Sequence, residues 1–503
     1  MSEKAELKKT LGLTGVTMNA MALIAPGAFL WLTFQLQASQ MNGANSTSMD
    51  MFAGLAFALI LSFLTAISYS KLSELYPNAG TGSSYYFAER AFLNEPSKLS
   101  SFTRVIKFIV GWISHLYYWA YPGVMVAMMA TLITYIFSQF GITVPIYGQI
   151  LIAVLFAGLT GAVAYRGING STLSSIVINV IQIVTLVFVT ILALIYRSTN
   201  PQHYEFVHKN LTSVIMPHSI SGVLFQSTIA MLVLVGFESA TALAGEAKSP
   251  KHVSRGVILS LVIQGIFCYF FEYTGADLWL NNGYKLVVDG KTLVGMDAAA
   301  ASSAPIGDMV KILGDTLLNN TGFILMILVA ISVALAVFGS TLACMNTGVR
   351  MTYAMAKDKE MPSALGLLHT KHATPHTAVW VITIVSAIIG GIGVISVTNL
   401  LAVTLLSNIG TFILYGLTNL IALVAFLHSP KRNLITHIIV PILGFIANVA
   451  MLIAIFYLGI LGGGATQVAS IAAIMVTVIW IIVGIIYLNI NSKRLNRPIV
   501  IAS

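Results

Sequence analysis

Three stretches of this 503-residue sequence contain no aspartate, glutamate, lysine or arginine. They cover residues 108–165, 372–430 and 433–492, and each is long enough to cross a bilayer twice, because about 20 helical residues span a hydrocarbon core of about 30 Å. Charged residues make up only 9% of the chain, whereas about 25% is usual in soluble domains. So little charge cannot cover the surface of a water-soluble protein of this length. We therefore predict an integral membrane protein.

Twelve membrane-spanning helices are predicted from the apolar segments. Each of the three uncharged stretches is divided by a turn-like sequence, near residues 141–148, 394–399 and 459–465. These stretches therefore give six helices. Six more apolar segments lie at 12–38, 51–73, 172–196, 219–246, 253–279 and 322–350. These runs are long and continuous rather than alternating, which favours helices over a transmembrane β-barrel. The predicted fold class is therefore an all-α integral membrane protein.

The distribution of basic residues predicts the orientation of these helices, because cytoplasmic loops carry an excess of lysine and arginine. If the N-terminus lies in the cytoplasm, only five of the 26 basic residues fall in loops on the outside, and the other 21 lie inside. The five are Arg197, Lys209, Lys285, Lys291 and Lys311. We therefore expect a multi-pass protein of the cell (inner or plasma) membrane, with both termini cytoplasmic.

Several classes of protein are disfavoured by the sequence. The two cysteines, Cys268 and Cys344, lie in apolar runs, so neither a disulfide framework nor a zinc site is expected. The sequence has no phosphate-binding loop and no nucleophile–base arrangement, which argues against an ATP-driven pump and against an enzyme. The basic residues are scattered, so nucleic acid is not an expected partner. We expect no cofactor and no metal, and the expected partners are the lipid bilayer and a small molecule.

Two of the predicted helices contain residues that interrupt helical hydrogen bonding. In the first, Pro26 removes a backbone donor near the centre and Gly27 permits a non-helical conformation. In the sixth, Gly236 and Gly245 flank the ionisable Glu238. These are the first members of two successive sets of five helices, and matching breaks in two halves indicate a substrate site between inverted repeats. The alternative is that proline and glycine only kink these helices, since both are common in membrane helices.

The two breaks supply the candidate substrate-binding residues. A helix broken in the membrane exposes backbone N–H groups, which suit a carboxylate, and C=O groups, which suit an ammonium group. The candidates are Ala25, Pro26, Gly27, Ala28, Gly236, Phe237, Glu238 and Ser239. Glu238 is also the candidate for proton coupling, because a charge at mid-bilayer costs about 2.5–3.5 kcal/mol and the carboxyl is expected to be neutral, paired or water-facing. The alternative is a carboxyl that stays protonated and only bonds a neighbouring helix.

Segments of the chain, taken in order, resemble the amino acid–polyamine–organocation (APC) superfamily of transporters. The end of the second predicted helix, 65–92, looks like the family signature, whose residues are here Leu72, Pro77, Gly80, Tyr85 and Tyr86. Two segments of the sixth helix, 236–239 and 244–250, resemble the matching part of the arginine/agmatine and glutamate/γ-aminobutyrate antiporters. The loop after the eighth helix is similar to the family's cytoplasmic loop at 352–366 and 374–379.

The resemblance implies a leucine-transporter-like core of two inverted five-helix repeats at 12–430, with two peripheral helices at 431–492 and short cytoplasmic segments at 1–11 and 493–503. It also implies secondary transport of amino acids by alternating access, through exchange or proton-coupled uptake. Many members have a Gly-Ser/Thr-Gly turn that binds the substrate carboxylate, whereas the turn here, Ala25-Pro26-Gly27, has no hydroxyl. An amine or polyamine importer therefore stays open, as does a sensor that binds substrate without transporting it.

Two residues are candidates for gating. Leu232 aligns with the aromatic gate of the arginine/agmatine antiporter, so that particular substrate is not supported. Tyr117 belongs to an aromatic run, with Tyr118 and Trp119, which either borders the substrate path or packs against neighbouring helices. His115 beside this run is interpreted as a packing residue.

The remaining charged residues are interpreted as interfacial. We expect Glu246 in a solvated cluster near Lys248 and Lys251, and Glu272 with Asp277 as an interfacial pair near the outer face. A cytoplasmic cluster is expected from Arg350, Lys357, Asp358, Lys359 and Glu360. The longest outside segment, 280–321, either caps a vestibule or is a solvated connector.

Overall fold

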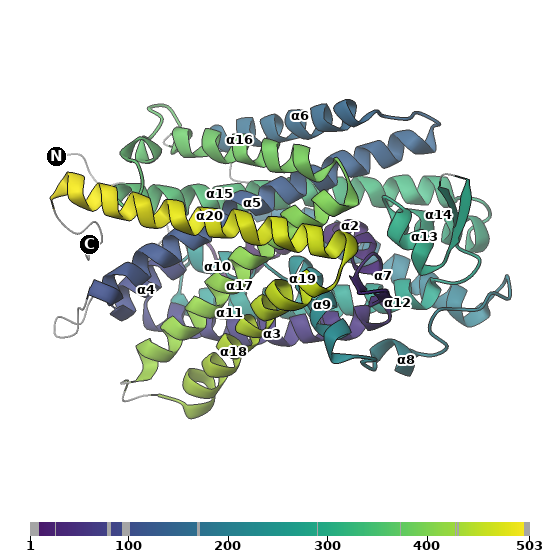
Figure 1. The fold of residues 1–503 in the computed structure, drawn as a ribbon, viewed down its shortest axis with the longest axis horizontal. Helices are drawn as coiled ribbons and strands as arrows, with labels where there is room; N and C mark the ends of the chain where they lie inside the picture. Colours follow the sequence, from purple (N-terminus) through teal and green to yellow (C-terminus); the bar gives the residue numbers. More distant parts are fainter. Residues whose placement is uncertain are drawn as a thin grey trace.

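The computed structural model describes residues 10–25, 27–77, 82–92, 101–167, 172–288, 290–372, 374–427, 429 and 432–496. Pro26 and Gly80, which the sequence analysis singled out, lie outside these ranges. Most of the described chain is α-helical, and the long helices run roughly along one direction (Figure 1).

The helices of the first part of the chain are α1 (Leu13–Ile24), α2 (Ala28–Ala38), α3 (Met51–Leu75), α4 (Ser84–Phe92), α5 (Ser101–Gln139), α6 (Ile146–Tyr165), α7 (Thr172–Thr199) and α8 (Leu211–Ile215). Between α2 and α3 lie a two-residue hairpin and a single 3-10 turn: β1 (Met41–Asn42), β2 (Asn45–Ser46) and η1 (Ser48–Asp50). The middle of the chain forms α9 (Ile220–Ala230), η3 (Met231–Val233), α10 (Ser239–Ala242), α11 (Pro250–Leu261), the π-helix η4 (Val262–Phe270) and α12 (Phe271–Trp279).

A second hairpin with two helices then precedes the C-terminal helices: β3 (Lys285–Val288), β4 (Lys291–Val294), α13 (Met296–Ala301) and α14 (Pro305–Leu317). The chain ends with α15 (Gly322–Lys357), η5 (Ser363–Gly366), α16 (His376–Gly393), α17 (Val397–Leu427), η6 (Ile435–Ile439), α18 (Val440–Ile453), η7 (Ala454–Leu458), α19 (Gly459–Leu461) and α20 (Gly464–Leu495).

Eleven helical segments of the described chain are long and apolar enough to cross a membrane. The predicted sixth crossing, 219–246, is not among them, because its apolar helix covers only Ile220–Val233 before the backbone becomes irregular. The prediction of an all-α, multi-pass membrane protein is confirmed. The count of twelve and the inverted repeats stay predictions.

The predicted breaks in the three uncharged stretches coincide with ends of helices. The helix α5 ends at Gln139 before α6 begins at Ile146, and α16 ends at Gly393 before α17 begins at Val397. The helix α15 differs, since it continues to Lys357 rather than ending at residue 350. A charged residue ends an apolar span but does not end helical hydrogen bonding, so the two boundaries need not agree.

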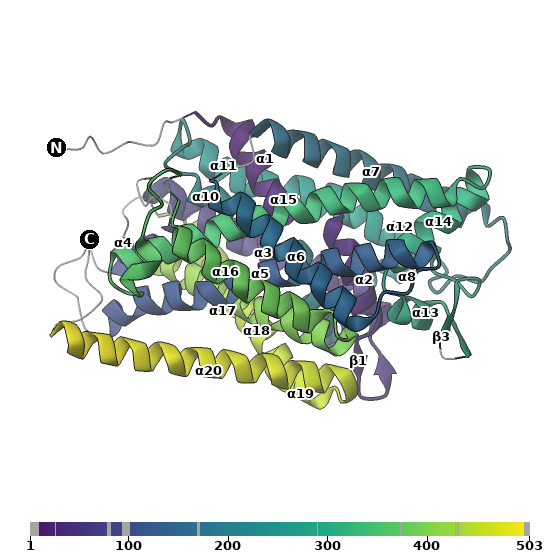
Figure 2. The same ribbon diagram turned by 90° about the horizontal axis from the view of Figure 1, so that it is seen from above.

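The long segment 280–321, which the sequence predicts to lie outside, forms regular elements. The strands β3 and β4 pair antiparallel, with Lys285 opposite Val294, and α13 and α14 follow them. These elements lie together at one end of the helix bundle, which we call the hairpin end, and α4 lies at the opposite end (Figures 1 and 2). Asp308 of α14 accepts hydrogen bonds from the hydroxyls of Tyr135, Tyr284 and Ser302, so the segment is tied to α5.

The helix α2, which follows the first break, lies inside the bundle, whereas α20 lies along one side of it (Figure 2). Every residue from Ala28 to Ala38 of α2 is buried. In contrast, α20 exposes many large apolar side chains, including Ile479 and Ile486. An exposed apolar surface on a helix suits contact with lipid, since lipid tails are as apolar as these side chains.

Candidate functional site

The first break separates α1 from α2. The helix α1 ends at Ile24, and Ala25 then adopts a φ of 48°, in the left-handed region that non-glycine residues rarely occupy. Gly27 has a φ of 75°, and α2 begins at Ala28. The interruption predicted from the sequence is therefore present between Ile24 and Ala28.

The second break lies between η3 and α10 and is in contact with the first. Gly236 has a φ of 122°, which glycine adopts at no steric cost. A Cβ atom on Gly236 would come within 2.9 Å of the backbone nitrogen of Ile24, so the two broken helices approach each other backbone to backbone. The irregular segment ends where α10 begins, at Ser239.

Side chains already bond the carbonyl groups that the first break releases. The hydroxyl of Tyr269 donates to the carbonyl oxygen of Ala25 at 2.8 Å and to that of Ile24 at 3.2 Å. The hydroxyl of Ser340 donates to the carbonyl oxygen of Leu23 at 2.7 Å. In this conformation these C=O groups already accept hydrogen bonds from the protein and are not free to bind an ammonium group. The sequence alone did not predict these bonds.

The first turn of α2 offers donors instead. Gly27 is the residue before the helix, and no side chain caps the helix there. The first N–H groups of a helix have no partner within it, and the positive end of the helix dipole favours an anion at the same place. The start of α2 therefore suits a carboxylate.

Glu238 is completely buried beside the second break. Its Oε2 atom accepts hydrogen bonds from the Gly236 N–H at 3.0 Å and from the Tyr415 hydroxyl at 2.6 Å. The carboxyl thus accepts the hydrogen bond that the Gly236 N–H would donate to a backbone carbonyl in an unbroken helix. The Oε1 atom is buried and has no hydrogen-bond partner among the described residues. One oxygen of Glu238 therefore supports the break, and the other is available to a proton or a ligand.

Aromatic rings from three helices surround Glu238. The ring of Tyr415 lies 5.3 Å from that of Phe237 and 5.9 Å from that of Tyr69, measured between centroids. Tyr69 and Tyr415 were missed by the sequence analysis, because each is one aromatic residue in an apolar span and only the fold brings them together. Tyr117 is fully buried, 5.3 Å from the ring of Tyr121. Leu232 lies in η3, also fully buried.

A large cavity extends from the second break toward the end opposite the hairpin. Its volume is about 520 Å³. It reaches Ser239, next to Glu238, and α1 and α15 contribute Asn19 and Phe338 to its wall. A cavity of this volume is large enough for an amino acid or a diamine, because ligand pockets typically have volumes of about 300–1,000 Å³.

An ion pair lies in the wall of this cavity. Arg350 Nη2 donates to Glu246 Oε1 at 3.1 Å, and both residues line the cavity. Beside them, the Leu11 N–H donates to the Glu246 carbonyl, and the Lys248 N–H donates to the Leu11 carbonyl, both at 2.9 Å. The expected cluster of Glu246 with lysines is therefore replaced by a pair with Arg350. Thr10 and Leu11, which precede α1, line the same cavity.

The predicted cluster of Arg350 with residues 357–360 is wrong, because Asp358 and Glu360 lie around Lys107 instead of Arg350. The buried ammonium group of Lys107 lies 2.5 Å from Glu89, 2.8 Å from Asp358 and 3.6 Å from Glu360. Burial raises the pKa of Glu360 to about 8, with Asp358 adding to the shift and Lys107 opposing it. Lys107 and Glu89 were missed because they lie far from residues 357–360 in the sequence.

Two other interpretations are settled by the contacts. His115 is a packing residue as predicted, with its ring nitrogens 2.7 Å from the Gly111 carbonyl and 3.0 Å from the Thr352 hydroxyl. Glu272 and Asp277 do not form the expected interfacial pair. Both are buried, and Asp277 pairs with His208 instead. Their distance along the helix from Arg255 placed both near the outer face, but that distance does not tell an interfacial residue from one covered by other helices.

Residues 9–492 match the model of the amino acid permease family. The chain belongs to this family. It is 25% identical to the low-affinity putrescine importer PlaP of Escherichia coli K12, over 99% of this chain and 97% of the relative. It is 24% identical to the branched-chain amino acid permease BcaP of Bacillus subtilis, over 98% of this chain and 95% of the relative. A methylthioribose transporter of Bacillus subtilis is 21% identical over 84% of this chain and 82% of the relative.

The permease is therefore an APC-type transporter and not an enzyme, as the sequence predicted. It is a multi-pass protein of the cell membrane. Its relatives carry small molecules of different chemistry, so the family alone does not select among amino acids, amines and other solutes.

Proposed function

We propose that this permease is a secondary transporter that carries amino acids across the cytoplasmic membrane by alternating access, through exchange or proton-coupled uptake. The observation that carries the proposal is the cavity of about 520 Å³ that ends at Ser239, beside the buried Glu238. With both termini in the cytoplasm, as the basic residues predict, this cavity opens to the cytoplasm. The conformation then corresponds to an inward-open state of the transport cycle.

The substrate binds between the two breaks in this proposal. Its carboxylate lies at the first turn of α2, after Gly27, where N–H groups and the helix dipole favour an anion. Its ammonium group approaches Glu238 Oε1, which has no partner in the described part of the chain. The proposed site is completed by Ala25, Ala28, Phe237 and Ser239. It also includes Pro26, which stands between Ala25 and Gly27 in the sequence.

Glu238 carries the coupled proton in this proposal. The carboxyl is completely buried, and an ionised carboxylate there is costly unless a cation faces it. A proton on Oε1 leaves the two hydrogen bonds of Oε2 intact, so protonation need not disturb the break. Tyr117 and Leu232 serve as gates beside this site. The alternative is that Glu238 remains protonated and only supports the break.

An amine or polyamine is the second candidate substrate. The turn at Ala25–Gly27 has no hydroxyl to hold a carboxylate, and Glu238 supplies an acidic group that suits an amine. The relative named as a putrescine importer matches nearly the whole chain, as does the relative named as a branched-chain amino acid permease. A sensor that binds substrate without transporting it is the third candidate.

Uptake into proteoliposomes tests these candidates. Purified permease is reconstituted and supplied with radiolabelled leucine or putrescine, with and without an inward proton gradient and with and without unlabelled substrate inside. Saturable uptake of leucine supports the first proposal, and saturable uptake of putrescine alone favours the amine. Stimulation by the proton gradient indicates proton coupling, and stimulation by internal substrate indicates exchange. Binding without flux favours the sensor and contradicts transport.

Replacing Glu238 with glutamine separates its two roles. A glutamine oxygen can still accept from the Gly236 N–H and the Tyr415 hydroxyl, so Glu238→Gln is expected to fold, but it cannot carry a proton. We expect the pH dependence of uptake to disappear and uphill uptake driven by the proton gradient to be lost, because the amide has no proton to exchange in this pH range. The control is Glu205→Gln, which neutralises an exposed carboxyl. Unchanged pH dependence in Glu238→Gln excludes the proton role.

A further inference from the structure

The large cavity continues past the proposed substrate site to a pair of opposite charges. Ser239 lines the cavity beside the second break, and Glu246, seven positions later in the sequence, lines it together with Arg350. At the rise of a helix, seven residues cover about 10 Å, which is more than the distance between the charged groups of an α-amino acid. A substrate bound at the breaks therefore leaves this pair unoccupied.

The pair is accessible from the cavity and is weakly held. Arg350 Nη2 donates to Glu246 Oε1 at 3.1 Å, and each side chain is 26% exposed. An ion pair that water can reach contributes little to stability, because water solvates the separated charges almost as well. A ligand that brings a carboxylate and an ammonium group can therefore replace both partners at little cost. Arg350 Nη1 also donates to the Ala242 carbonyl at 3.4 Å, which keeps the guanidinium group at the cavity during such an exchange.

A second donor lies beside the guanidinium group. Asn346 stands about one turn before Arg350 on α15, and residues four apart share one face of a helix. Both line the cavity, and the Asn346 amide has no hydrogen-bond partner among the described residues. A guanidinium group binds a carboxylate through two parallel hydrogen bonds, and an amide N–H can add a third. This part of the wall therefore suits a carboxylate, and Glu246 beside it suits an ammonium group.

The charges of the pair favour an amino acid over a diamine. An α-amino acid can offer its carboxylate to Arg350 and its ammonium group to Glu246, so two ion pairs replace one. A diamine can bind Glu246 only, and it leaves Arg350 without its partner and facing a like charge. Such repulsion is a general way in which a site rejects the wrong ligand.

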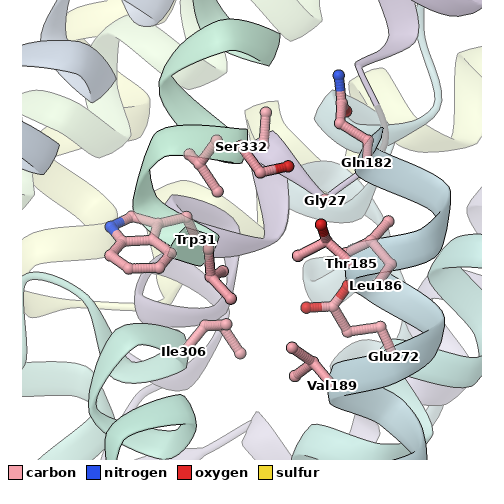
Figure 3. A pocket seen from close by; sticks show the side chains of 12 residues that line it. Gly27, Trp31, Gln182, Thr185, Leu186, Val189, Glu272, Ile306 and Ser332 are labelled. Atoms are coloured by element: carbon pink, nitrogen blue, oxygen red, sulfur yellow. The ribbon is translucent and has the colours of Figure 1, made fainter. Parts of the chain in front are cut away.

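The volume of the large cavity admits this second position. About 520 Å³ lies within the range of ligand pockets, whereas a small cavity beside the first break has only about 10 Å³. Gly27, Leu186 and Glu272 are among the residues that line the small cavity, and the space between them holds about one water molecule (Figure 3). An amino acid that leaves the breaks therefore has room on the side of Glu246 and Arg350, and not in the small cavity.

We propose that Arg350, Asn346 and Glu246 form a release subsite, where a zwitterionic amino acid pauses between the breaks and the cytoplasm. Its carboxylate binds Arg350 and Asn346, and its ammonium group binds Glu246. The subsite rests on the proposed function, because it needs an amino acid as substrate and a cavity that opens to the cytoplasm. An amino acid that enters from the cytoplasm meets the same residues first, so the subsite also loads the carrier during exchange.

Uptake measured separately from the two faces of the membrane tests the subsite. Right-side-out and inside-out membrane vesicles from cells that express the permease are supplied with radiolabelled leucine, and uptake by vesicles without the permease is subtracted. For Arg350→Gln we expect the KM for leucine at the cytoplasmic face to rise at least about tenfold, the loss expected for a hydrogen bond to a charged group. The KM at the outer face should stay within about twofold of the wild-type value. A merely structural role would change both faces together.

Three further variants separate the contributions. Asn346→Ala removes an unpartnered amide and leaves the ion pair intact, so it should fold, and its KM at the cytoplasmic face should rise about threefold. Glu246→Gln should raise the same KM about tenfold, because it removes the partner of the ammonium group. Lys248→Gln is the matched control and should behave like wild type. It removes an exposed charge two residues from Glu246 that does not line the cavity.

Isopentylamine, which is leucine without its carboxylate, gives a second readout as a competitor of labelled leucine. At the cytoplasmic face of wild type and of Lys248→Gln, unlabelled leucine should compete better than isopentylamine. In Arg350→Gln this preference should shrink at least about fivefold, because the group that binds the carboxylate is gone. A full wild-type preference in Arg350→Gln would show that Arg350 does not bind the carboxylate, and would overturn the subsite.

The outcomes separate the subsite from the proposed function. Uptake of leucine by the wild type, with an unchanged cytoplasmic KM in Arg350→Gln and Asn346→Ala, overturns the subsite alone, and so does an equal rise at both faces. If Arg350→Gln is inactive at both faces, Asn346→Ala decides between these results. Wild-type vesicles that take up no leucine contradict the proposed function and the subsite with it.

Discussion

At the scale of single residues, Gly236 brings the two broken helices into contact. Its φ of 122° and the 2.9 Å that would separate a Cβ atom from the Ile24 nitrogen leave no room for a side chain. The sequence predicted a break here because glycine permits it. It did not predict that the glycine touches α1, because that contact joins residues more than two hundred positions apart.

Gly236→Ala should therefore separate the breaks. Forcing an L-residue into this conformation costs about 1–3 kcal/mol, and the close contact adds to that cost. We expect a lower melting temperature and loss of substrate uptake. The control is Gly158→Ala in α6, where a Cβ atom meets nothing within 4 Å. Wild-type uptake and stability in Gly236→Ala would contradict a close contact between the breaks.

Glu238 shows how far residue-level prediction reaches. The sequence identified an ionisable residue in a membrane span, and the structure shows that it is completely buried. Its bonds to Gly236 and Tyr415 did not follow, because they depend on the fold of α17 beside the break. The same limit applies to Glu272, whose burial depends on how other helices pack against α12.

At the scale of elements, the length of the apolar segments predicted the helices well, whereas proximity in the sequence predicted the charge clusters poorly. The chain passes from α5 to α6 and from α16 to α17 where turn-like sequences divide the uncharged stretches. The cluster expected at 350–360 failed because α15 separates its members. Arg350 faces the large cavity, whereas Lys359 has a φ of 63° and turns the chain so that Glu360 approaches Lys107. Sequence neighbours were assigned to one cluster that the fold divides in two.

The Lys107 cluster predicts a dependence of stability on pH. Burial raises the pKa of Glu360 to about 8, above the value of about 4.3 for an unfolded glutamate. Between these values the folded chain binds a proton that the unfolded chain does not. The contribution of Glu360 to stability is therefore present below about pH 4.3 and is lost as pH rises to about 8.

Glu360→Gln should remove this dependence. A neutral amide resembles the protonated carboxyl, so the variant should match wild type at low pH and be more stable near pH 8. The slope that is lost is at most about 1.4 kcal/mol per pH unit. Melting temperatures from pH 5 to 9 measure it, with Asp297→Asn as the control. A wild-type slope in Glu360→Gln would show that another group titrates.

At the scale of the whole molecule, the cavity connects one end of the bundle to the second break, while the hairpin end is covered by folded segments. The class of fold follows from composition, because a chain with 9% charged residues must place most of its surface in lipid. The cavity does not follow from the sequence, since its volume depends on how α1, α7 and α15 are spaced. Ser239 is the point where the cavity and the break meet.

The central claim is that substrate lies at the meeting point of the two breaks, and protection of Ser239→Cys from a thiol reagent tests it most directly. The native cysteines, Cys268 and Cys344, are buried, so background labelling should be low, and Ser470→Cys on α20 is a buried control. Leucine or putrescine, whichever is taken up by proteoliposomes, is added at saturation. The account predicts that Ser239→Cys is labelled without substrate and protected at least about tenfold with it. Equal labelling rates with and without a transported substrate would contradict it.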